Sequence, residues 1–259
     1  MDIKLINKLI DQGAIFYCSH SGGKDSQAMY SYLRTIIPHD QIVVIHADLG
    51  NVEWTGVQDH IIKNIYHFPH IVKAGKTFLE MVRTRHQKRP DVPSWPSPKY
   101  RQCTSDLKYG PLMKFIRNDL KDRGLSLCVN CTGIRAEESS ARSKKVPLQI
   151  NKKMTLKSGV RTCYDWMPIF DWSTEQVFDE IYRSGQKPFW AYGKRGELNE
   201  RLSCVFCIMG SKNDLRHGAE QRPELLQEYL DVEKETGYTM FRIKNENIPL
   251  DQYIKIKNV

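Results

Sequence analysis

The stretch CSHSGGKDS, residues 18–26, lies between an apolar, strand-like run and a segment with helical periodicity. Two adjacent glycines give its backbone unusual freedom, and serines, a lysine and an aspartate surround them. Beyond the stretch, apolar residues recur at helical spacing until Pro38, at Met29, Leu33, Ile36 and Ile37. A strand, a polar loop and a helix are therefore predicted as the opening unit of the fold.

Apolar, β-rich runs alternate with helical patterns along the first half of the chain. They are AIFYCS (14–19), QIVVIHA (41–47), HIVKAG (70–75) and LSLCVNCTGI (125–134). This alternation predicts an α/β fold with a mainly parallel sheet. We expect residues 1–172 to form the main domain and residues 173–259 a helical, cysteine-bearing C-terminal appendage, without a clear linker between them.

The glycine loop has the composition of an anion-binding site. In a parallel sheet, ligands bind beyond the carboxyl ends of the strands, where the N-terminus of the next helix offers unpaired N–H groups. Positive φ at Gly22 and Gly23 would let amides converge, Ser21 and Ser26 add hydroxyls, and Lys24 adds charge. The spacing matches neither the Walker loop nor the dinucleotide turn. The alternative is a glycine-rich turn with an aspartate cap.

Composition narrows the class of protein further. The 259 residues carry a net charge of +9, with 39 Lys and Arg against 30 Asp and Glu, which favours anionic partners such as nucleotides or nucleic acid. We see no signal-peptide pattern and no apolar run of membrane-spanning length, so we expect a cytoplasmic protein. The seven cysteines, an odd number, indicate metal ligands, reactive thiols or core residues rather than a disulfide framework.

Four ordered motifs carry a resemblance to a known family. SGGKDS resembles the PP-loop of the adenine-nucleotide α-hydrolase superfamily, and HADLGNVEW (46–54) resembles the acidic end of that fold's second strand. CTGIRAEESSAR (131–142) resembles a G-x-R-x-x-E-S element, and MPIFDWSTEQVFDEI (167–181) a P-x-x-x-W segment. Over residues 14–210 the chain is similar to the phosphoadenosine phosphosulfate (PAPS) reductase family, which implies a Rossmann-like PP-loop fold.

The resemblance implies an adenine-nucleotide site, with ATP or PAPS as ligand. Asp48 would lie near the ribose, although it could instead cap the helix expected near Glu53. Arg135 would offer a planar fork to phosphate or sulfate, or else form a surface ion pair with Glu137 or Glu138. The implied nucleotide-binding residues are Ser21, Gly22, Gly23, Lys24, Asp25, Ser26, His46, Ala47, Asp48, Gly133 and Arg135.

The cysteines fall into two groups. Cys128 and Cys131 lie three apart in one strand, so their side chains point to opposite faces and are expected to pack in the core. Cys204 and Cys207 lie in a turn, RLSCVFCIMGSKND, where both sulfurs can face one metal or cluster.

A third thiol, Cys103, is flanked by Arg101 and Lys108, which we expect to favour its thiolate. Cys163 is the candidate for a fourth ligand, unless it is simply buried in a strand. The resemblance favours a [4Fe-4S] cluster, with zinc as the alternative.

The basic segment 142–161, with Pro147 and Gly159, has poor helical periodicity and is expected to be a mobile loop. It could close over nucleotide phosphates, meet a polynucleotide backbone, or be a solvated charge cluster.

The chain departs from the reductase pattern because no cysteine follows Cys207, where that pattern has a catalytic tail cysteine. We therefore expect an ATP pyrophosphatase and sulfurtransferase, which releases pyrophosphate and activates a nucleic-acid substrate for sulfur insertion. RQCTSDLK (101–108) resembles an element of the DNA phosphorothioation sulfurtransferases. The expected catalytic residues are Lys24, Asp25, Cys103 and Arg135.

The expected partners are an adenine nucleotide, Mg²⁺, DNA or tRNA, and a sulfur donor such as a cysteine desulfurase, with no membrane. The first alternative is a PAPS or adenosine phosphosulfate reductase that releases sulfite. The second is a non-catalytic nucleotide-binding module.

Overall fold

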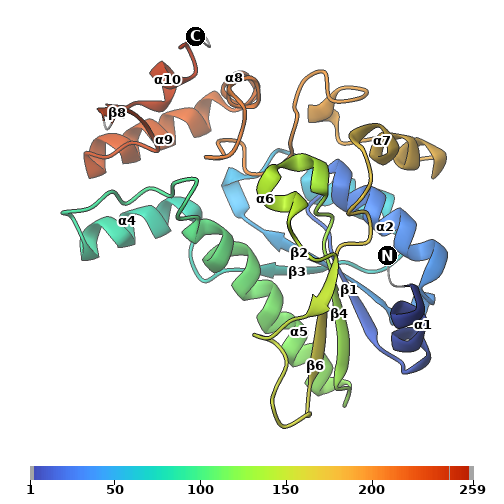
Figure 1. The fold of residues 1–259 in the computed structure, drawn as a ribbon. Helices are drawn as coiled ribbons and strands as arrows, with labels where there is room; N and C mark the ends of the chain where they lie inside the picture. Colours follow the sequence, from blue (N-terminus) through green and yellow to red (C-terminus); the bar gives the residue numbers. More distant parts are fainter. Residues whose placement is uncertain (1–2, 245, 257–259) are drawn as a thin grey trace. The chain divides into compact units, whose positions relative to one another are not determined.

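A computed structural model describes residues 3–244 and 246–256 (Figure 1). Its main feature is a six-stranded sheet with the order β3-β2-β1-β4-β6-β5. The pairs β1–β2, β1–β4 and β4–β6 are parallel, and β5 is antiparallel to β6. The strands are β1 (Ile15–Ser19), β2 (Ile42–Asp48), β3 (His70–Lys73), β4 (Leu127–Cys131), β5 (Leu148–Ile150) and β6 (Thr162–Trp166).

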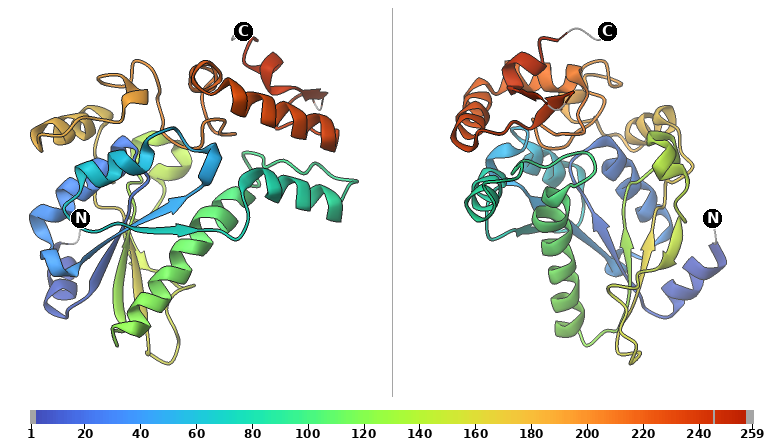
Figure 2. Two further views of the ribbon diagram at one scale, coloured as in Figure 1. Left: turned by 180° about the vertical axis from the view of Figure 1, so that it is seen from behind. Right: turned by 60° about the vertical axis from the view of Figure 1, so that its left-hand side comes forward.

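Helices cover both faces of this sheet because successive residues of the central strands β1, β2 and β4, which point to opposite faces, are mostly buried and apolar. One core contains Phe16, Cys18 and Cys131 together with apolar residues of α1 (Ile3–Asp11), α2 (Lys24–Ile36) and α7 (Thr174–Arg183). The opposite core contains Tyr17 and Cys128 together with residues of α5 (Gly110–Asp122). Figure 2 shows α5 on one side of the strands and α2 on the other.

The described chain separates into two compact units. The first comprises the chain up to Ala47, Gly56–Val72 and Pro111–Trp190, and it holds most of the sheet, α3 (Val57–Asn64) and α6 (Ser140–Ser143). The second comprises Asp48–Thr55, Lys73–Gly110 and the chain from Ala191 onward. This division does not coincide with the predicted boundary between residues 172 and 173, because residues 73–110 pack with the C-terminal helices.

The second unit is built around aromatic rings packed on Tyr229. Tyr229 lies 5.6 Å from both Phe78 and Trp95 and 5.1 Å from Phe206, measured between ring centroids. These rings join segments that are far apart in sequence, which explains why the unit is interleaved with the first. Its elements are α4 (Phe78–Lys88), α8 (Lys212–Gln221), α9 (Pro223–Thr236), α10 (Leu250–Tyr253) and the hairpin β7 (Phe241–Ile243) and β8 (Glu246–Ile248).

The predicted α/β fold with a mainly parallel sheet and a helical C-terminal region is confirmed. The strand between residues 125 and 134 is shorter than its apolar run and ends at Cys131, where the chain turns toward Gly133. Among the described residues, no helix combines the length and apolar character needed to cross a membrane.

A candidate nucleotide-binding loop and a thiol cluster

The glycine loop connects the carboxyl end of β1 to the N-terminus of α2. Gly22 adopts a φ of 77°, in the left-handed region that favours glycine. Gly23 differs from expectation, because it is the N-cap of α2 in an extended conformation with a φ of −78°. As a glycine, the N-cap residue has no side chain that could cap the helix and cover the amides of its first turn with a carboxylate or hydroxyl.

Hydrogen bonds within the loop fix its shape. The Ser26 hydroxyl donates to the Gly23 carbonyl oxygen at 2.9 Å and accepts from the Ser21 amide at 3.1 Å. The Gly22 amide donates to Nδ1 of His20 at 3.1 Å. The Ser26 hydroxyl therefore closes the loop on itself, rather than serving only as a donor for a ligand.

His20 must be neutral to accept the Gly22 amide at Nδ1. Burial, together with the neighbouring imidazoles of His46 and His60, lowers the pKa of His20 to about 3. The proton of the neutral ring then lies on Nε2, which is buried and has no hydrogen-bond partner among the described residues. The loop sequence is thus supported by a histidine that our sequence interpretation missed, although it lies two residues before the first glycine.

Close backbone packing also requires the glycines at two positions. A Cβ atom on Gly22 would lie 2.8 Å from Cγ1 of Val57, in α3. A Cβ atom on Gly133 would lie 2.8 Å from the backbone carbon and oxygen of Asp25 and 3.0 Å from the amide of Ser26. Gly133, which was predicted as a nucleotide-binding residue, therefore allows the segment after β4 to touch the first turn of α2.

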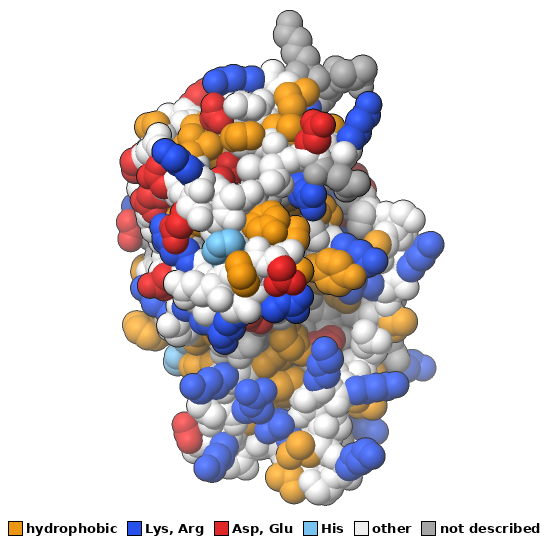
Figure 3. Space-filling model, turned by 90° about the vertical axis from the view of Figure 1, so that its left-hand side faces the viewer, with side chains coloured by type: hydrophobic (Ala, Val, Ile, Leu, Met, Phe, Trp, Pro, Cys, Tyr) orange, Lys and Arg blue, Asp and Glu red, His pale blue; other side chains and the backbone are white. Residues whose placement is uncertain are grey.

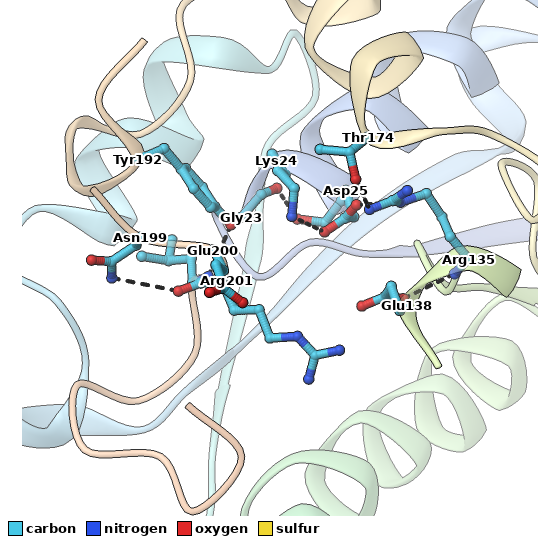
Figure 4. A network of polar contacts seen from close by, with 12 residues as sticks. Gly23, Lys24, Asp25, Arg135, Glu138, Thr174, Tyr192, Asn199, Glu200 and Arg201 are labelled. Carbon is cyan, nitrogen blue, oxygen red and sulfur yellow. Dashed lines mark hydrogen bonds and ion pairs between the residues drawn. The ribbon is translucent and has the colours of Figure 1, made fainter. Parts of the chain in front are cut away.

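An ion-pair network links the first turn of α2 to that same segment (Figure 4). Asp25 accepts from Nε of Arg135 at 2.6 Å through Oδ1, and from Nζ of Lys24 at 3.1 Å through Oδ2. The Arg135 guanidinium also donates to Glu137 at 2.7 Å, to the Trp172 carbonyl oxygen at 3.1 Å and to the Thr174 hydroxyl at 3.2 Å. Asp25 thus anchors the loop to the later part of the same unit.

Arg135 is only 2% exposed, so it is not a surface residue, and its guanidinium group already has protein partners in place of a phosphate. Burial disfavours its charged form, but the charge of Asp25 and the hydrogen bonds to Asp25 and Glu137 outweigh that effect, and its pKa is raised. The pairing with Glu137 agrees with the alternative interpretation from sequence. Thr174, the first residue of α7, completes the network, and the capping box that begins at Ser173 is the signal that marks this turn.

The end of β2 brings two predicted residues close to the loop. His46 is buried, and its Nδ1 lies 3.0 Å from the carbonyl oxygen of His20. Ala47 is half-buried beside it in the strand. Both belong to the first unit, as does the loop, so the structure brings them together within one compact body.

Asp48, the last residue of β2, belongs to the second unit. Its Oδ1 accepts from the Gly50 amide at 2.7 Å, and its Oδ2 lies 2.6 Å from Nζ of Lys73. The carboxylate therefore holds the first amide of a 3-10 turn at Gly50–Val52, whose N-cap residue is Leu49 and which begins somewhat earlier than the helix we expected near Glu53. The position of Asp48 near a ribose stays a prediction.

Three cysteines gather in the second unit. The thiol of Cys204 hydrogen-bonds to Cys207, and this contact lowers the pKa of Cys207 to about 5 and raises that of Cys204. The Met209 amide also donates to the Cys207 sulfur at 3.4 Å. Cys103 is close enough for its charge and that of Cys207 to influence each other. The prediction that both sulfurs of the C-x-x-C turn lie on one side of it is consistent with this contact.

The thiolate expected at Cys103 is not found. Burial raises the pKa of Cys103, and the charge of Lys108 offsets only part of that effect. The low pKa lies instead at Cys207, because its hydrogen bonds outweigh its burial. A π-helix spans Thr104–Tyr109 directly after Cys103. This conformation is rare in proteins, and where it occurs it often lies at a functional site.

Cys163 lies in the first unit, as the second residue of β6 and opposite Cys128 in β4. Both are fully buried in the core beneath α5. Cys131 lies in the core on the other face of the sheet, as its spacing from Cys128 predicts. Cys163 is therefore a buried strand residue, the second of the two possibilities that the sequence left open.

Thiols are suitable ligands for iron or zinc, and the three thiols lie near one another, but they do not have the arrangement of a complete metal site. Across residues 3–244 and 246–256, no group of three or more His, Cys, Asp or Glu is placed to hold a metal ion. Beside the thiols, the Tyr229 hydroxyl is 0% exposed and lacks a hydrogen-bond partner among the described residues. Burial and the charges of Cys204, Cys207 and Cys103 raise its pKa. A buried hydroxyl without an acceptor fits a ligand held by these thiols.

A mainly parallel sheet with a glycine loop between its first strand and the following helix defines the Rossmann-like α/β class of fold. Residues 15–194 match the family described as phosphoadenosine phosphosulfate reductase domain, and the chain belongs to that family. The family is named for a reductase of an adenine nucleotide.

Two curated relatives come from Methanocaldococcus jannaschii. "Uncharacterized protein MJ0973" is 27% identical over 85% of this chain and 48% of its own length. "Uncharacterized protein MJ0066" is 26% identical over 83% of this chain and 40% of its own length. The chain thus spans less than half the length of these relatives. A solved structure, the Candida glabrata FMN adenylyltransferase in complex with ATP, is similar with a TM-score of 0.36 and 15% identity, covering 70% of this chain and 50% of that one.

Proposed function

We propose that this chain is an ATP pyrophosphatase and sulfurtransferase that activates a nucleic acid for sulfur insertion. The observation that carries the proposal is the loop between β1 and α2, where an uncapped helix N-terminus, a left-handed Gly22 and the buried Lys24 meet. Such a loop binds the phosphates of a nucleotide and stabilises pyrophosphate as it leaves. Membership of the reductase-domain family supports adenine as the base.

The reaction requires two substitutions. An oxygen of the substrate attacks the α-phosphorus of ATP, the bond to the β-phosphate oxygen breaks, and pyrophosphate leaves with that electron pair. A sulfur nucleophile then attacks the adenylated centre and expels AMP. Lys24 would offset the negative charge that develops on pyrophosphate. Both carboxylate oxygens of Asp25 have cationic partners, Arg135 and Lys24, which favours a role in holding the loop over direct binding of Mg²⁺.

Cys103, Cys204 and Cys207 would hold an iron–sulfur cluster, with zinc as the competing metal. When bound, a cluster with an open iron supplies a place to carry sulfide. The support comes from the protein's own groups: the Met209 amide hydrogen-bonds the Cys207 sulfur, and the unpartnered Tyr229 hydroxyl lies beside the thiols. Hydrogen bonds of this kind tune cluster potentials. A cysteine desulfurase would be a suitable sulfur donor, and DNA or tRNA the acceptor.

A second candidate is a reductase of PAPS or adenosine phosphosulfate. It is favoured by the family's name and by the low pKa of Cys207, since a thiolate is the nucleophile that such a reduction needs. A nucleotide-binding module without turnover would share the loop but neither reaction.

Three assays distinguish these functions. Pyrophosphate released from ATP only when nucleic acid is present supports the first function, and sulfite released from PAPS with thioredoxin supports the second. Tight nucleotide binding without either product supports the third. Lys24→Ala should abolish pyrophosphate release, whereas Lys4→Ala, an exposed lysine of α1, should not. If ATP, AMP and PAPS all fail to bind by calorimetry, the proposal is wrong.

The cluster is tested separately by anaerobic purification followed by iron and acid-labile sulfide analysis. Cys204→Ser should lose most of the iron, and the matched control Cys128→Ala, a thiol of the sheet core, should keep it. Absence of iron and sulfide from the wild-type protein would remove the cluster from the proposal and leave the nucleotide site standing.

A further inference from the structure

The positive charge of the chain is concentrated in one stretch. Residues 111–161 contain twelve Lys and Arg but four Asp and Glu, a net charge of +8 out of +9 for the whole chain. Three of these twelve have carboxylate partners, since Arg123 pairs with Asp119, Arg135 with Asp25 and Arg142 with Glu138. Most of the Lys and Arg without a carboxylate partner in this stretch lie in α5 and in the segment between β5 and β6.

Six of the remaining cations form one surface, which we call the basic face. It consists of Lys114, Arg117 and Lys121 of α5 and Lys152, Lys153 and Lys157 of the segment 151–161. All six are exposed, and none forms an ion pair within the described part of the chain. Spacings of three and four residues place the α5 cations on one side of that helix, over about 10 Å. Lys and Arg side chains dominate this region in the lower part of Figure 3.

The two halves of the basic face are fixed to each other. Met154 is buried in the same core as Met113, Ile116 and Leu120 of α5, and its sulfur lies 3.7 Å from Nη1 of Arg117. This contact brings the segment 151–161 against the side of α5.

The segment itself is closed by hydrogen bonds. The Asn151 side chain accepts from the amides of Lys153 and Met154 at 3.1 and 3.0 Å, and Nε of Arg161 donates to the Met154 carbonyl oxygen at 2.7 Å. In place of the mobile loop we expected for 142–161, the structure has α6, β5 and this hydrogen-bonded turn.

Lys121 and the segment 151–161 lie at the opposite end of the sheet from the nucleotide loop, and the α5 cations extend from there along the helix to Lys114. The C-terminus of α5 leads into the first residue of β4, and Arg161 precedes the first residue of β6. The loop follows the last residue of β1, which pairs in parallel with β4. A five-residue strand spans roughly 17 Å, so cations at the amino ends of the strands cannot contact phosphates held at the carboxyl ends. A ligand that spans the whole basic face must therefore be a different anion.

We propose that the basic face binds the sugar–phosphate backbone of a nucleic acid and anchors it away from the reaction centre. A stripe of unpaired cations along a helix, widened by a second row on a fixed turn, matches the repeating charge of a polynucleotide. The inference deepens the proposed function and rests on it for the presence of a nucleic-acid substrate. The contacts are to phosphates, so they provide affinity and register rather than sequence specificity.

The experiment compares two triple variants of the full chain with the wild type. One is Lys114→Gln, Arg117→Gln and Lys121→Gln on the basic face. The matched control is Lys4→Gln, Lys8→Gln and Lys63→Gln, three exposed lysines of the same unit outside that face. Fluorescence anisotropy measures binding of DNA duplex and of RNA duplex between about 50 and 200 mM salt.

We expect the basic-face variant to bind at least tenfold more weakly. The slope of log affinity against log salt should decrease by roughly 2 to 3, because each lost phosphate contact removes about 0.9. The control should keep the wild-type slope, and both variants should keep the wild-type melting curve and ATP affinity. A preference for one duplex would identify the anchored strand as DNA or RNA.

Three results would overturn the inference: unchanged nucleic-acid binding, an equal loss in the control variant, or a loss of binding to vesicles of anionic phospholipid with duplex binding intact. The last would assign the face to a membrane surface, with the exposed Leu156 and Val160 as its apolar contacts. Pyrophosphate release is measured in parallel. Wild-type protein that binds duplex through this face but releases no pyrophosphate would refute the proposed reaction while leaving the anchoring surface in place.

Discussion

Replacing Gly133 with alanine tests whether the shape of the nucleotide loop depends on close backbone packing. The new Cβ would lie 2.8 Å from the carbonyl carbon and oxygen of Asp25, and a normal contact requires about 0.6 Å more. The obstacle is the backbone of the first turn of α2, which cannot rotate away as a side chain can. Overpacking costs roughly 1 to 3 kcal/mol, and we expect Gly133→Ala to lower the free energy of unfolding by about 2 to 3 kcal/mol.

The same displacement should weaken nucleotide binding. An amide moved by about half an ångström loses most of one hydrogen bond to a charged phosphate oxygen, worth roughly 1.5 to 3 kcal/mol. ATP should therefore bind about 10-fold to 100-fold more weakly. Urea unfolding followed by circular dichroism measures the first effect, and isothermal titration calorimetry measures the second, under conditions where the variant is folded.

Gly75→Ala is the matched control. Gly75 is exposed, has a φ outside the left-handed region, and a Cβ there would meet no heavy atom within 4 Å. We expect the control to change the free energy of unfolding by less than about 0.5 kcal/mol. The reasoning is refuted if Gly133→Ala behaves like the control in both assays. A loss of stability with unchanged ATP affinity would show that the amides of α2 do not contact the nucleotide.

Three further predictions concern buried polar groups. Tyr229→Phe should raise the free energy of unfolding of the metal-free protein by about 1 kcal/mol, because it removes an unsatisfied hydroxyl. After iron–sulfur reconstitution, the same substitution should lower the free energy of unfolding. Urea unfolding of the metal-free and the reconstituted protein checks both signs. Burial raises the pKa of Glu233 from 4.5 to about 7, so the folded state holds an extra proton in that interval, and the contribution of Glu233 to stability should fall by at most about 3 kcal/mol as the pH rises through it. Because His20 titrates in part of the same interval, the measured quantity is the difference between the pH profiles of the wild type and Glu233→Gln, and a difference that does not change with pH would contradict the assignment. The contribution of His20 to stability depends on pH with the opposite sign, because burial lowers the pKa of His20 from 6.5 to about 3. This contribution should be full above pH 6.5 and decline toward pH 3. Thermal melts at a series of pH values should show a flatter profile for His20→Gln than for the wild type.

The parts of the fold that depend on local pattern could be predicted from the sequence. Alternating apolar runs indicated the parallel sheet, and the glycines and serines of residues 21–26 indicated the loop after β1. The packing roles of Cys128 and Cys131 followed from strand geometry, since residues three apart point to opposite faces. Each of these inferences needs only a few neighbouring residues.

The remaining features depend on contacts between distant segments. Arg135 was expected to face phosphate, but its partner Asp25 lies 110 positions away, and no local pattern reveals such a pairing. The interleaved second unit arises because Phe78 and Trp95 pack on Tyr229, which the spacing of apolar residues does not disclose. The pKa of Cys103 was misjudged for a related reason: flanking cations are visible in the sequence, whereas burial is not.

The anchoring of Asp25 by Arg135 has a consequence for biosynthesis. Arg135 is itself held by the Trp172 carbonyl and the Thr174 hydroxyl, so the network closes only when the chain has been made through α7. A nascent chain that is halted on the ribosome before that point contains all residues of the glycine loop but lacks the residues that hold the loop in place. Competence to hold a nucleotide should therefore arise late and abruptly during translation, well after the loop has left the exit tunnel.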